Sequence, residues 1–433
     1  MILKRETNIC LLKTMDIRKK IDQAILSLLI VFSPIIFIFR FFKNKENKRS
    51  ILEKICFSSK NRTIGKIIWF HGASVGEILS IVPILEKYEK DKSIKKILLT
   101  TSTLSSSKVI KKLKFKKIIH QFYPLDHTLF AKKFLNHWKP NFVIFIESEI
   151  WPAMFREINK KKIPLILLNA RITKKTFKRW IKIKKFARSI FNNILISYPQ
   201  NQETKFYLEK LGSKKIIKIG NLKFVENNFE KKISNRKSFN SIFQNKKVWV
   251  ASSTHKNEEI FCAKAHIELK KQNKNLITII IPRHVHRVKQ IVKDIQNLGL
   301  SIAIHSSNKG NLKGKDIYIV DTFGETKKFH ELASSVFLGG SIVSRGGQNP
   351  LEAARSGARI LHGPNIDNFK DVYKLLKFLK ISIQIRSPKK LASLILFKKN
   401  KYKALKIKKI GRKIFNKTII EIDNLINNEF KKT

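Results

Sequence analysis

The feature that most constrains this chain is a repeated alternation of short apolar runs with amphipathic stretches. In the first half the apolar runs lie at residues 67–70, 97–101, 142–147, 164–170, 194–199 and 216–221. In the second half they lie at residues 248–253, 276–283, 301–306, 317–321, 336–340 and 359–363. Between the runs apolar residues recur at helical spacing, as Ile78, Ile81, Val82 and Leu85 do. Continuous apolar strands that alternate with helices predict parallel sheets covered on both faces.

The polar segment 226–246 has no strong period and separates the two series, so we interpret it as a domain linker. A chain of 433 residues is long enough for two domains. We predict an anchor with a basic flank, a first Rossmann-like domain, the linker, a second Rossmann-like domain and a basic terminal helix, with the boundaries 1–50, 51–225, 226–246, 247–410 and 411–433. The whole basic tail 401–433 is expected to be helical. Two such domains form a cleft where strand ends face each other and ligands bind.

The N-terminal stretch from Ala24 to Phe39 contains no charged residue, and basic residues flank it on both sides. At about 1.5 Å per residue it reaches roughly 24 Å, less than the ~30 Å hydrocarbon core of a bilayer. Extension to Phe42, with Arg40 snorkelling to the interface, would let it span. No small-residue cleavage site follows, so we expect an uncleaved anchor that either spans the membrane or lies in one leaflet.

The chain is strongly basic, with a formal net charge of +59. Lysine supplies 73 of the 90 basic residues and is spread along the chain, whereas arginine usually dominates base and phosphate recognition. We therefore attribute the charge to compositional drift together with a general attraction to anions, and we expect no specific nucleic acid partner. A basic RNA- or membrane-binding protein without enzymatic activity is the alternative. Cys10, Cys56 and Cys262 lie far apart without a CxxC pair, so no metal or redox motif follows.

The first candidate site lies in "WFHGASVGEILS", where a predicted strand hands over to a predicted helix at Ser74–Glu77. The spacing fits a capping box, in which Ser74 and Glu77 satisfy each other's backbone amides. It also fits a carboxylate that faces a cleft and takes a proton from a substrate hydroxyl. In that case the helix N-terminus is expected to keep Glu77 ionised, as a base requires.

The second candidate site is "SRGGQNPLEAARSG", residues 344–357. Asn349 suits a helix N-cap, Pro350 suits the first helical position, and Glu352 completes a box-like pattern. This pattern is typical of a well-formed helix start. It is also typical of a phosphate site at exposed helix amides, with Glu352 holding ribose hydroxyls.

Further polar residues stand at predicted strand ends. Arg283 follows one strand and suits an anionic ligand, and Gly324 and Glu325 follow another. Glu147 and Glu149 have one residue between them, so on a strand their side chains would point the same way. Such a pair suits acid–base work, although a solvated strand end is the commoner reason for it.

The chain resembles the 3-deoxy-D-manno-octulosonic acid (Kdo) transferases of lipopolysaccharide synthesis. The motifs "HGASVGE", "FIESEIWP", "NARIT", "GNLKF", "SSTHKNEE", "PRHVHR", "DTFGE" and "GGSIVSRGGQNPLEAA" occur in the order seen in that family. The resemblance implies a GT-B fold, two Rossmann-like domains facing a cleft, with a terminal helix packing back on the first domain. It implies inverting, metal-independent transfer of Kdo from CMP-Kdo to lipid IVA, without a further cofactor. It also implies an anionic membrane partner, at the cytoplasmic face of the inner membrane.

The resemblance also assigns roles to residues of this chain. The family's general base matches Glu77, and its transition-state stabilisers match Glu147 and Lys223. Its CMP contacts match Pro282, Arg283, Phe323, Gly324, Glu325, Asn349, Pro350, Leu351 and Glu352.

The chain departs from the family pattern in places. Gln348 stands where relatives often carry histidine, and "TKKFHEL" after Glu325 replaces a more apolar run, so that helix is expected to pack differently. The rival hypothesis within the same fold is a transferase that uses a UDP-sugar and a lipid acceptor.

Overall fold

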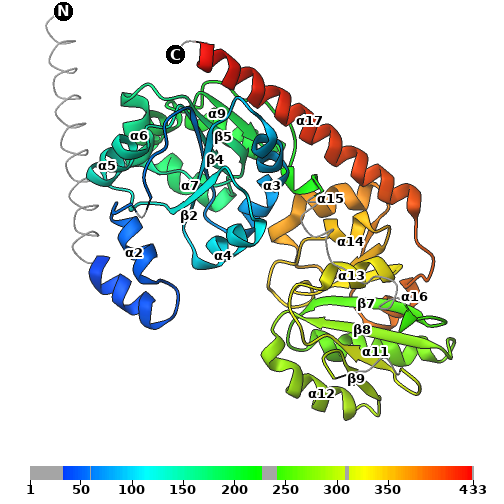
Figure 1. Ribbon diagram of the computed structural model, residues 1–433. Coiled ribbons are helices and arrows are strands. Elements are labelled where there is room, and N and C mark those ends of the chain that lie inside the picture. Colours follow the sequence, from blue (N-terminus) through cyan, green and yellow to red (C-terminus); the bar gives the residue numbers. More distant parts are fainter. Residues whose placement is uncertain (1–32, 59, 227–240, 308–311, 432–433) are drawn as a thin grey trace, which may run out of the picture. The chain divides into compact units, whose positions relative to one another are not determined.

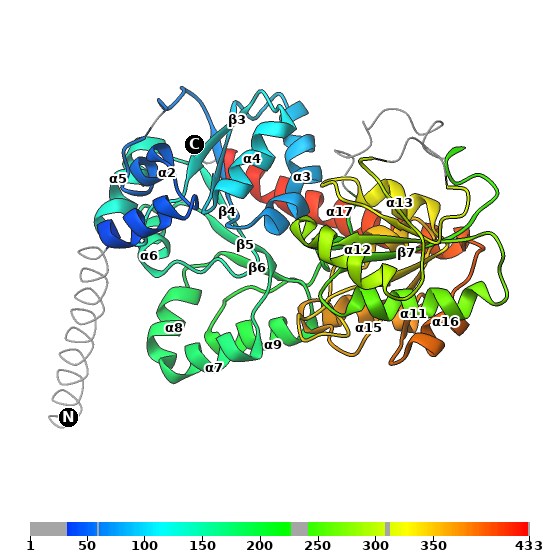
Figure 2. The ribbon, with the colours of Figure 1, turned by 90° about the horizontal axis from the view of Figure 1, so that it is seen from below.

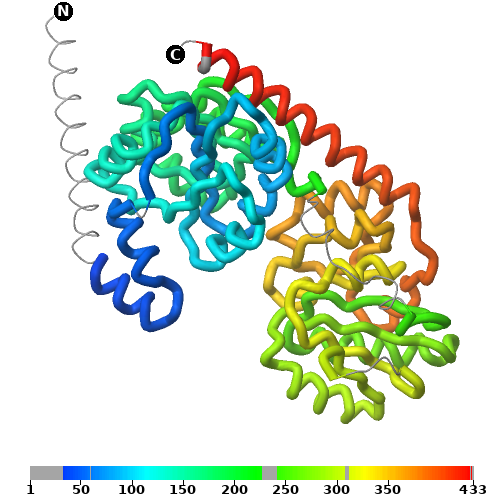
Figure 3. Tube along the Cα trace, in the orientation of Figure 1, coloured from blue at the N-terminus to red at the C-terminus, as the bar shows by residue number. Residues whose placement is uncertain are grey.

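The computed structural model describes residues 33–58, 60–226, 241–307 and 312–431. The chain forms two compact units: unit 1 is Met1–Phe229 with Ile414–Thr433, and unit 2 is Glu230–Lys413. In Figure 3 unit 1 runs from blue to green and includes the red end of the chain, and unit 2 runs from green to orange. Each unit contains a sheet of parallel strands with helices packed against it, which confirms the predicted α/β class.

Unit 1 contains a six-stranded sheet in the order β3-β2-β1-β4-β5-β6. Its strands are β1 (Ile67–His71), β2 (Lys96–Thr101), β3 (Ile118–Phe122), β4 (Phe142–Ile146), β5 (Leu165–Ala170) and β6 (Ile196–Pro199). Its helices are α2 (Lys48–Lys54), α3 (Val75–Lys90), α4 (Leu104–Leu113), α5 (Thr128–Trp138), α6 (Pro152–Lys160), α7 (Lys174–Lys182), α8 (Lys184–Phe191), α9 (Gln202–Leu211) and the short η1 (Leu222–Phe224). Because β1, β4 and β5 are neighbours and parallel, their carboxyl ends meet at one edge of the sheet.

Alternate residues of β1 pack on opposite faces of this sheet. Trp69 joins the apolar core formed with α5, α6, α8 and α9, and its ring centroid lies 4.8 Å from that of Phe134. Phe70 faces the other way and lies 6.3 Å from the ring of Tyr88 in α3. Figures 1 and 2 show α3 and α4 on one side of the sheet and α5 and α6 on the other. Burial of both faces explains why these strands are continuously apolar.

The C-terminal helix α17 runs over Lys401–Lys431, which confirms the predicted helical tail. Its second half belongs to unit 1, where Asp423 accepts hydrogen bonds from Lys87 Nζ at 2.6 Å and from the Tyr88 hydroxyl at 2.9 Å. Gly220 has φ +130°, and a Cβ there would lie 2.9 Å from the Ile414 side chain, so only glycine fits beneath the helix. The implied packing of a terminal helix on the first domain is therefore confirmed.

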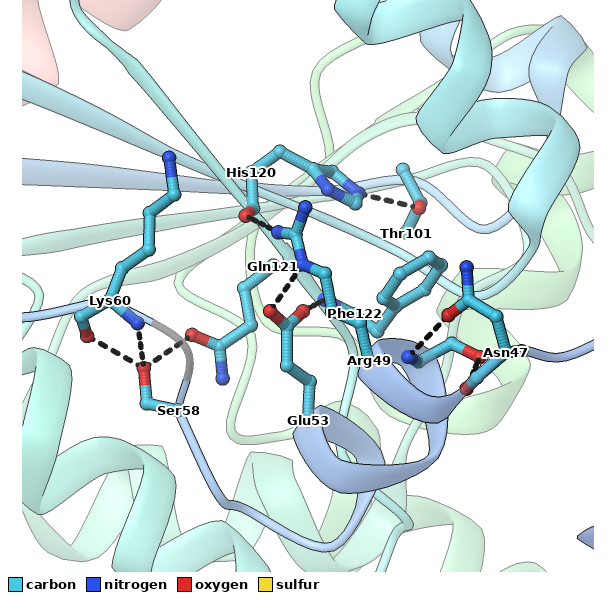
Figure 4. Close-up of polar contacts among 10 residues, drawn as sticks. Asn47, Arg49, Glu53, Ser58, Lys60, Thr101, His120, Gln121 and Phe122 are labelled. Atoms are coloured by element: carbon cyan, nitrogen blue, oxygen red, sulfur yellow. Dashed lines mark hydrogen bonds and ion pairs between the residues drawn. The ribbon is translucent and has the colours of Figure 1, made fainter.

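Helix α2 covers the edge strand β3 (Figure 4). Glu53 Oε2 accepts the backbone N–H of Phe122 at 2.7 Å, and Arg49 donates to the carbonyl of His120 at 2.9 Å. Arg49 also donates to Glu53 Oε1 at 2.7 Å. These contacts satisfy backbone groups that an edge strand otherwise exposes.

The predicted anchor lies largely outside the described residues, and its described part belongs to a helical stretch at residues 33–42. Glu46, which is 3% exposed, joins this stretch to α2 by accepting from Arg40 at 2.9 Å and from Lys54 at 2.6 Å. Among the residues that the structure describes, no helix is both long enough and apolar enough to cross a bilayer.

Unit 2 contains a seven-stranded parallel sheet in the order β13-β12-β11-β7-β8-β10-β9. Its strands are β7 (Lys247–Thr254), β8 (Leu276–Pro282), β9 (Ile302–Ile304), β10 (Ile317–Ile319), β11 (Ser335–Leu338), β12 (Arg359–His362) and β13 (Ser382–Gln384). Its helices are α11 (Glu258–Lys270), η3 (Val285–Arg287), α12 (Val288–Gln296), α13 (Thr326–Leu332), α14 (Leu351–Arg355), η4 (Asp367–Phe369), α15 (Lys370–Phe378) and α16 (Pro388–Leu394). The core beneath α11, α12 and α16 includes the fully buried Trp249 and Phe337.

A fully buried carboxylate organises the loop after β11. Glu258 accepts the backbone N–H groups of His255, Gly340, Ser341 and Ile342 at 2.7–3.0 Å. Four amide donors satisfy the oxygens of this buried side chain, which offsets the cost of burying them. Glu258 therefore fixes the turn that leads toward the second candidate site.

The strand predictions failed at two kinds of place. The run at 216–221 is not a strand: only Ile216 pairs, with Ser197, and the chain then turns at Gly220 toward η1. The strands β3 and β13 were not predicted, because β3 carries the polar His120 and Gln121 and β13 is short.

Candidate active site

Glu77 stands in the first turn of α3, just after β1. Its Oε2 accepts the backbone N–H of Ala73 at 2.7 Å, and its Oε1 accepts the hydroxyl of Ser74 at 3.0 Å. Ser74 is the N-cap and its Oγ accepts from the Glu77 amide at 3.4 Å. The capping interpretation is therefore right for Ser74, but Glu77 reaches the amide of Ala73 and not that of Ser74.

The expectation that the helix N-terminus keeps Glu77 fully ionised is wrong. Burial, and after it the charges of Glu149 and Glu147, together raise the pKa of Glu77 to about 7, against the lowering effect of the Ala73 amide and the Ser74 hydroxyl. Desolvation and like charges outweigh the helix dipole here. A carboxylate with a pKa near neutrality suits a general base better than one at its ordinary value.

Glu147 follows β4 and forms a buried ion pair. Its Oε1 lies 2.7 Å from Nζ of Lys223 in η1, and the Glu147 side chain is 5% exposed. Asn169, at the end of β5, donates to the same carboxylate at 3.5 Å and accepts from the Leu222 amide at 3.0 Å. Both Glu147 and Asn169 have φ in the left-handed region, at 56° and 53°. Asn169 therefore ties the segment that carries Lys223 to the strand next to Glu147.

Glu149 has different partners. Its Oε2 accepts from the Trp151 indole at 2.9 Å and lies 3.3 Å from Nε2 of His71, the last residue of β1. Burial lowers the pKa of His71, although Glu149 opposes this, so the neutral ring donates through Nε2. The Nδ1 atom of His71 lies 2.9 Å from the hydroxyl of Thr100, which can donate to it.

The prediction that Glu147 and Glu149 point the same way is wrong. The strand ends at Ile146, and the left-handed φ of Glu147 breaks the alternation, so the two carboxylates take separate partners. Both still act on Glu77 electrostatically. The structure thus brings Glu77, Glu147 and Lys223 to one edge of the unit 1 sheet, and it adds His71, a residue to which the sequence assigned no role.

In unit 2 the predicted residues also follow strand ends. Pro282 ends β8 and is buried, and Arg283 is exposed beyond it with its amide bonded to the Thr254 carbonyl at 2.9 Å. The loop after β10 leaves Phe323 79% exposed, and Gly324 takes φ +86°. These groups lie beyond the carboxyl ends of adjacent strands.

Glu325 occupies the N-cap position of α13 and is surrounded by donors. It accepts from Nε2 of His305 at 3.0 Å, from the Thr322 hydroxyl and from Lys328 Nζ. Burial alone would raise the pKa of Glu325, but Lys328, Thr322 and His305 lower it below the usual value. This carboxylate therefore stays ionised and suits binding rather than proton transfer.

The helix that was expected to begin at Pro350 begins one residue later and has only five residues. Helix α14 begins at Leu351, Pro350 is its N-cap residue, and Asn349 Oδ1 accepts the Leu351 amide at 3.1 Å. Five residues leave little helix dipole at this end, so the phosphate expectation loses that support. Glu352 does not complete a capping box: its Oε1 accepts from Nδ1 of His330 at 2.8 Å.

The fold was compared with solved structures. The Anabaena protein HepE, solved with UDP and glucose, has a TM-score of 0.53 at 12% identity, over 85% of this chain and 100% of that chain. A UDP-N-acetylglucosamine 2-epimerase has a TM-score of 0.52 at 11% identity, over 83% of this chain and 98% of that chain. At this identity the likeness concerns the fold, and it places the chain in the class of proteins built from two parallel-sheet α/β domains.

Sequence comparison defines the family. A family model described as 3-deoxy-D-manno-octulosonic-acid transferase (kdotransferase) matches residues 46–226. The 3-deoxy-D-manno-octulosonic acid transferase of Rickettsia felis is 36% identical over 74% of this chain and 69% of the relative. That of Rickettsia bellii is 34% identical over 85% of this chain and 87% of the relative. The chain therefore belongs to the Kdo transferase family, which confirms the resemblance seen in its motifs.

Proposed function

We propose that this protein is a GT-B glycosyltransferase that moves Kdo from CMP-Kdo to lipid IVA, with inversion and without a metal or other cofactor. The observation that carries the proposal is Glu77, a carboxylate with a pKa of about 7 in the same unit as the Glu147–Lys223 pair. Family membership supports the sugar and the reaction class.

In this proposal Glu77 accepts the proton of an acceptor hydroxyl while that oxygen bonds to the anomeric carbon of Kdo. The bond from that carbon to the phosphate oxygen breaks, and CMP leaves with the bonding electrons. The Glu147 carboxylate favours the positive charge that develops on the sugar, or it orients Lys223, whose cation favours the departing anion. Arg283, Glu325 and Glu352 hold the nucleotide with the loops that carry Pro282, Phe323–Gly324 and Asn349–Leu351.

We further propose that the protein works at the cytoplasmic face of the inner membrane, against an anionic lipid surface. The described part of the anchor region supports this, since Ile35, Ile38 and Phe42 are 65%, 57% and 79% exposed beside Lys43 and Lys45. Exposed apolar side chains flanked by lysine are typical of interfacial segments.

The test is to incubate the full chain with CMP-Kdo and lipid IVA and to measure the mass of the lipid. Wild type is expected to add Kdo, and E77Q to fold with a normal circular dichroism spectrum and lose activity about 10³-fold, within the range of general-base contributions. The control is E86Q on the same helix, which should remain active. An active E77Q variant would refute the assignment of the base.

The nucleotide is tested separately by thermal shift. CMP is expected to raise the melting temperature, and UDP to leave it unchanged. Protection by UDP and not by CMP would support a UDP-sugar transferase instead. Absence of product, together with tight salt-sensitive binding to RNA, would support the non-enzymatic alternative.

A further inference from the structure

A buried histidine links three segments of unit 2. His330, in α13, is 3% exposed. Its Nδ1 lies 2.8 Å from Glu352 Oε1 in α14, and its Nε2 lies 3.0 Å from the hydroxyl oxygen of Ser252 near the end of β7. These contacts join residues 22 and 78 positions apart in the chain.

The partners define which atom donates. An ionised carboxylate only accepts, so Nδ1 of His330 carries the proton that it gives to Glu352. The hydroxyl of Ser252 can then donate to Nε2, which fixes the tautomer of the ring. Because Ser252 is 1% exposed, its hydroxyl is not offered to a substrate, and the three residues suit positioning rather than nucleophilic attack.

A second contact between α13 and α14 involves the main chain of His330. The hydroxyl of Ser356, which directly follows α14, lies 2.9 Å from the carbonyl of His330 and 2.7 Å from that of Ala353, and it can donate its proton to either. α13 and α14 are thus joined through the side chain and through the main chain of one residue. The ring can change its orientation only by breaking buried hydrogen bonds, which makes it a rigid support for Glu352.

One oxygen of Glu352 is left for a ligand. His330 occupies Oε1, and for Oε2 the described residues supply no hydrogen-bond donor, while the Glu352 side chain is 33% exposed. Burial alone would raise the pKa of Glu352, but the hydrogen bond from His330, with the charges of Lys327 and Arg355, lowers it below the usual value. The carboxylate is therefore both oriented and kept ionised.

We infer that His330 is a positioning residue for donor binding: it holds Glu352 so that the free carboxylate oxygen receives the hydroxyl donors of a nucleoside monophosphate. This inference rests on the proposed function, in which Glu352 binds the nucleotide.

The experiment is a calorimetric titration of the full-length protein with CMP over a range of pH. Three variants, H330F, H330N and S252A, change the hydrogen bonds that lead to Glu352. H330F keeps an aromatic ring but removes the donor, and we expect about tenfold weaker binding, the typical cost of one charge-assisted hydrogen bond. H330N retains a donor near the Nδ1 position and should recover most of the affinity. S252A removes the hydroxyl that bonds to Nε2 of His330, so the ring proton is no longer held at Nδ1. The hydrogen bond from His330 to Glu352 is then only partly lost, and binding should weaken about threefold.

The pH profile separates positioning from a merely structural role. Glu352 must be ionised to accept hydroxyl donors, so binding is lost as pH falls through its pKa. In H330F burial still raises that pKa while the main lowering contact is gone, so the loss of affinity should begin at higher pH than in wild type. In H330N the onset should return toward that of wild type.

His266 offers a matched control, because it is fully buried in the same unit and its Nδ1 bonds to the Thr278 hydroxyl at 2.8 Å. H266F should change stability but not CMP affinity. Wild-type affinity and an unshifted pH profile in H330F overturn the inference; if H330F fails to fold, the same result in S252A overturns it. Two other outcomes would refute the nucleotide-binding role that the proposed function gives to Glu352: wild type does not bind CMP, or E352Q binds CMP normally.

Discussion

Unit 1 and unit 2 both place glutamates beyond the ends of parallel strands, yet the two environments move the pKa in opposite directions. In unit 1 Glu77 is half-buried, and desolvation together with the charges of Glu149 and Glu147 raises its pKa to about 7. In unit 2 Glu325 and Glu352 each have histidine partners, and both pKa values are lowered. The same residue type thus titrates near neutrality in one unit and is held ionised in the other.

The largest expected effect concerns the lysine partners in the two units. K223M leaves Glu147 charged and buried, so we expect the free energy of unfolding to fall by about 3 kcal/mol and the transfer rate by roughly 10²-fold. The counterpart K328M leaves Glu325 with His305 and Thr322 and should cost less than about 1 kcal/mol. Urea denaturation measures the free energy of unfolding of both variants. Equal losses of stability in K223M and K328M would contradict the contrast between the two units.

A smaller effect is expected in the stability of E77Q. The pKa of Glu77 is higher in the folded than in the unfolded protein, so the ionised carboxylate lowers the stability of the fold above pH 7. This loss of stability disappears as the pH falls toward the pKa that Glu77 has in the unfolded chain. At pH 8 E77Q should therefore be more stable than wild type by roughly 1–2 kcal/mol, and at pH 5 by much less. E352Q should show no such gain at pH 8, and if it did, the contrast between the units would not hold.

The smallest expected effect is a displaced pH–rate profile in E149Q. Glu149 raises the pKa of Glu77, so its removal should move the acid limb of kcat/KM to lower pH and increase the relative rate at pH 6 a few-fold. E325Q, in the other unit, should weaken donor binding without moving that limb. An acid limb that stays in place in E149Q would show that Glu149 only holds His71 and Trp151.

The central strands of both sheets could be predicted because burial on both faces demands continuous apolar residues, as in β1, β4, β7 and β8. Glu77, Glu147 and Lys223 could be named because the motifs around them resemble those of the Kdo transferases. Asn169 and His330 received no role, because their function depends on partners 22 to 78 positions away, which no local pattern encodes. The orientation of Glu149 was wrong because a left-handed φ at Glu147 is invisible to a period of two.

The cover that α2 gives to β3 decides where the chain tolerates shortening. A protein trimmed to begin at residue 51, the predicted domain boundary, would lose Glu46 and Arg49 and leave the amino group of Lys54 without its carboxylate. The carbonyl of His120 in the edge strand β3 would then be exposed and could accept a hydrogen bond from a strand of another copy of the protein. A protein that begins at residue 33 keeps Glu46, Arg49 and the cover of β3, so solubility is better sought by polar replacement of the exposed Ile35, Ile38 and Phe42 than by deletion.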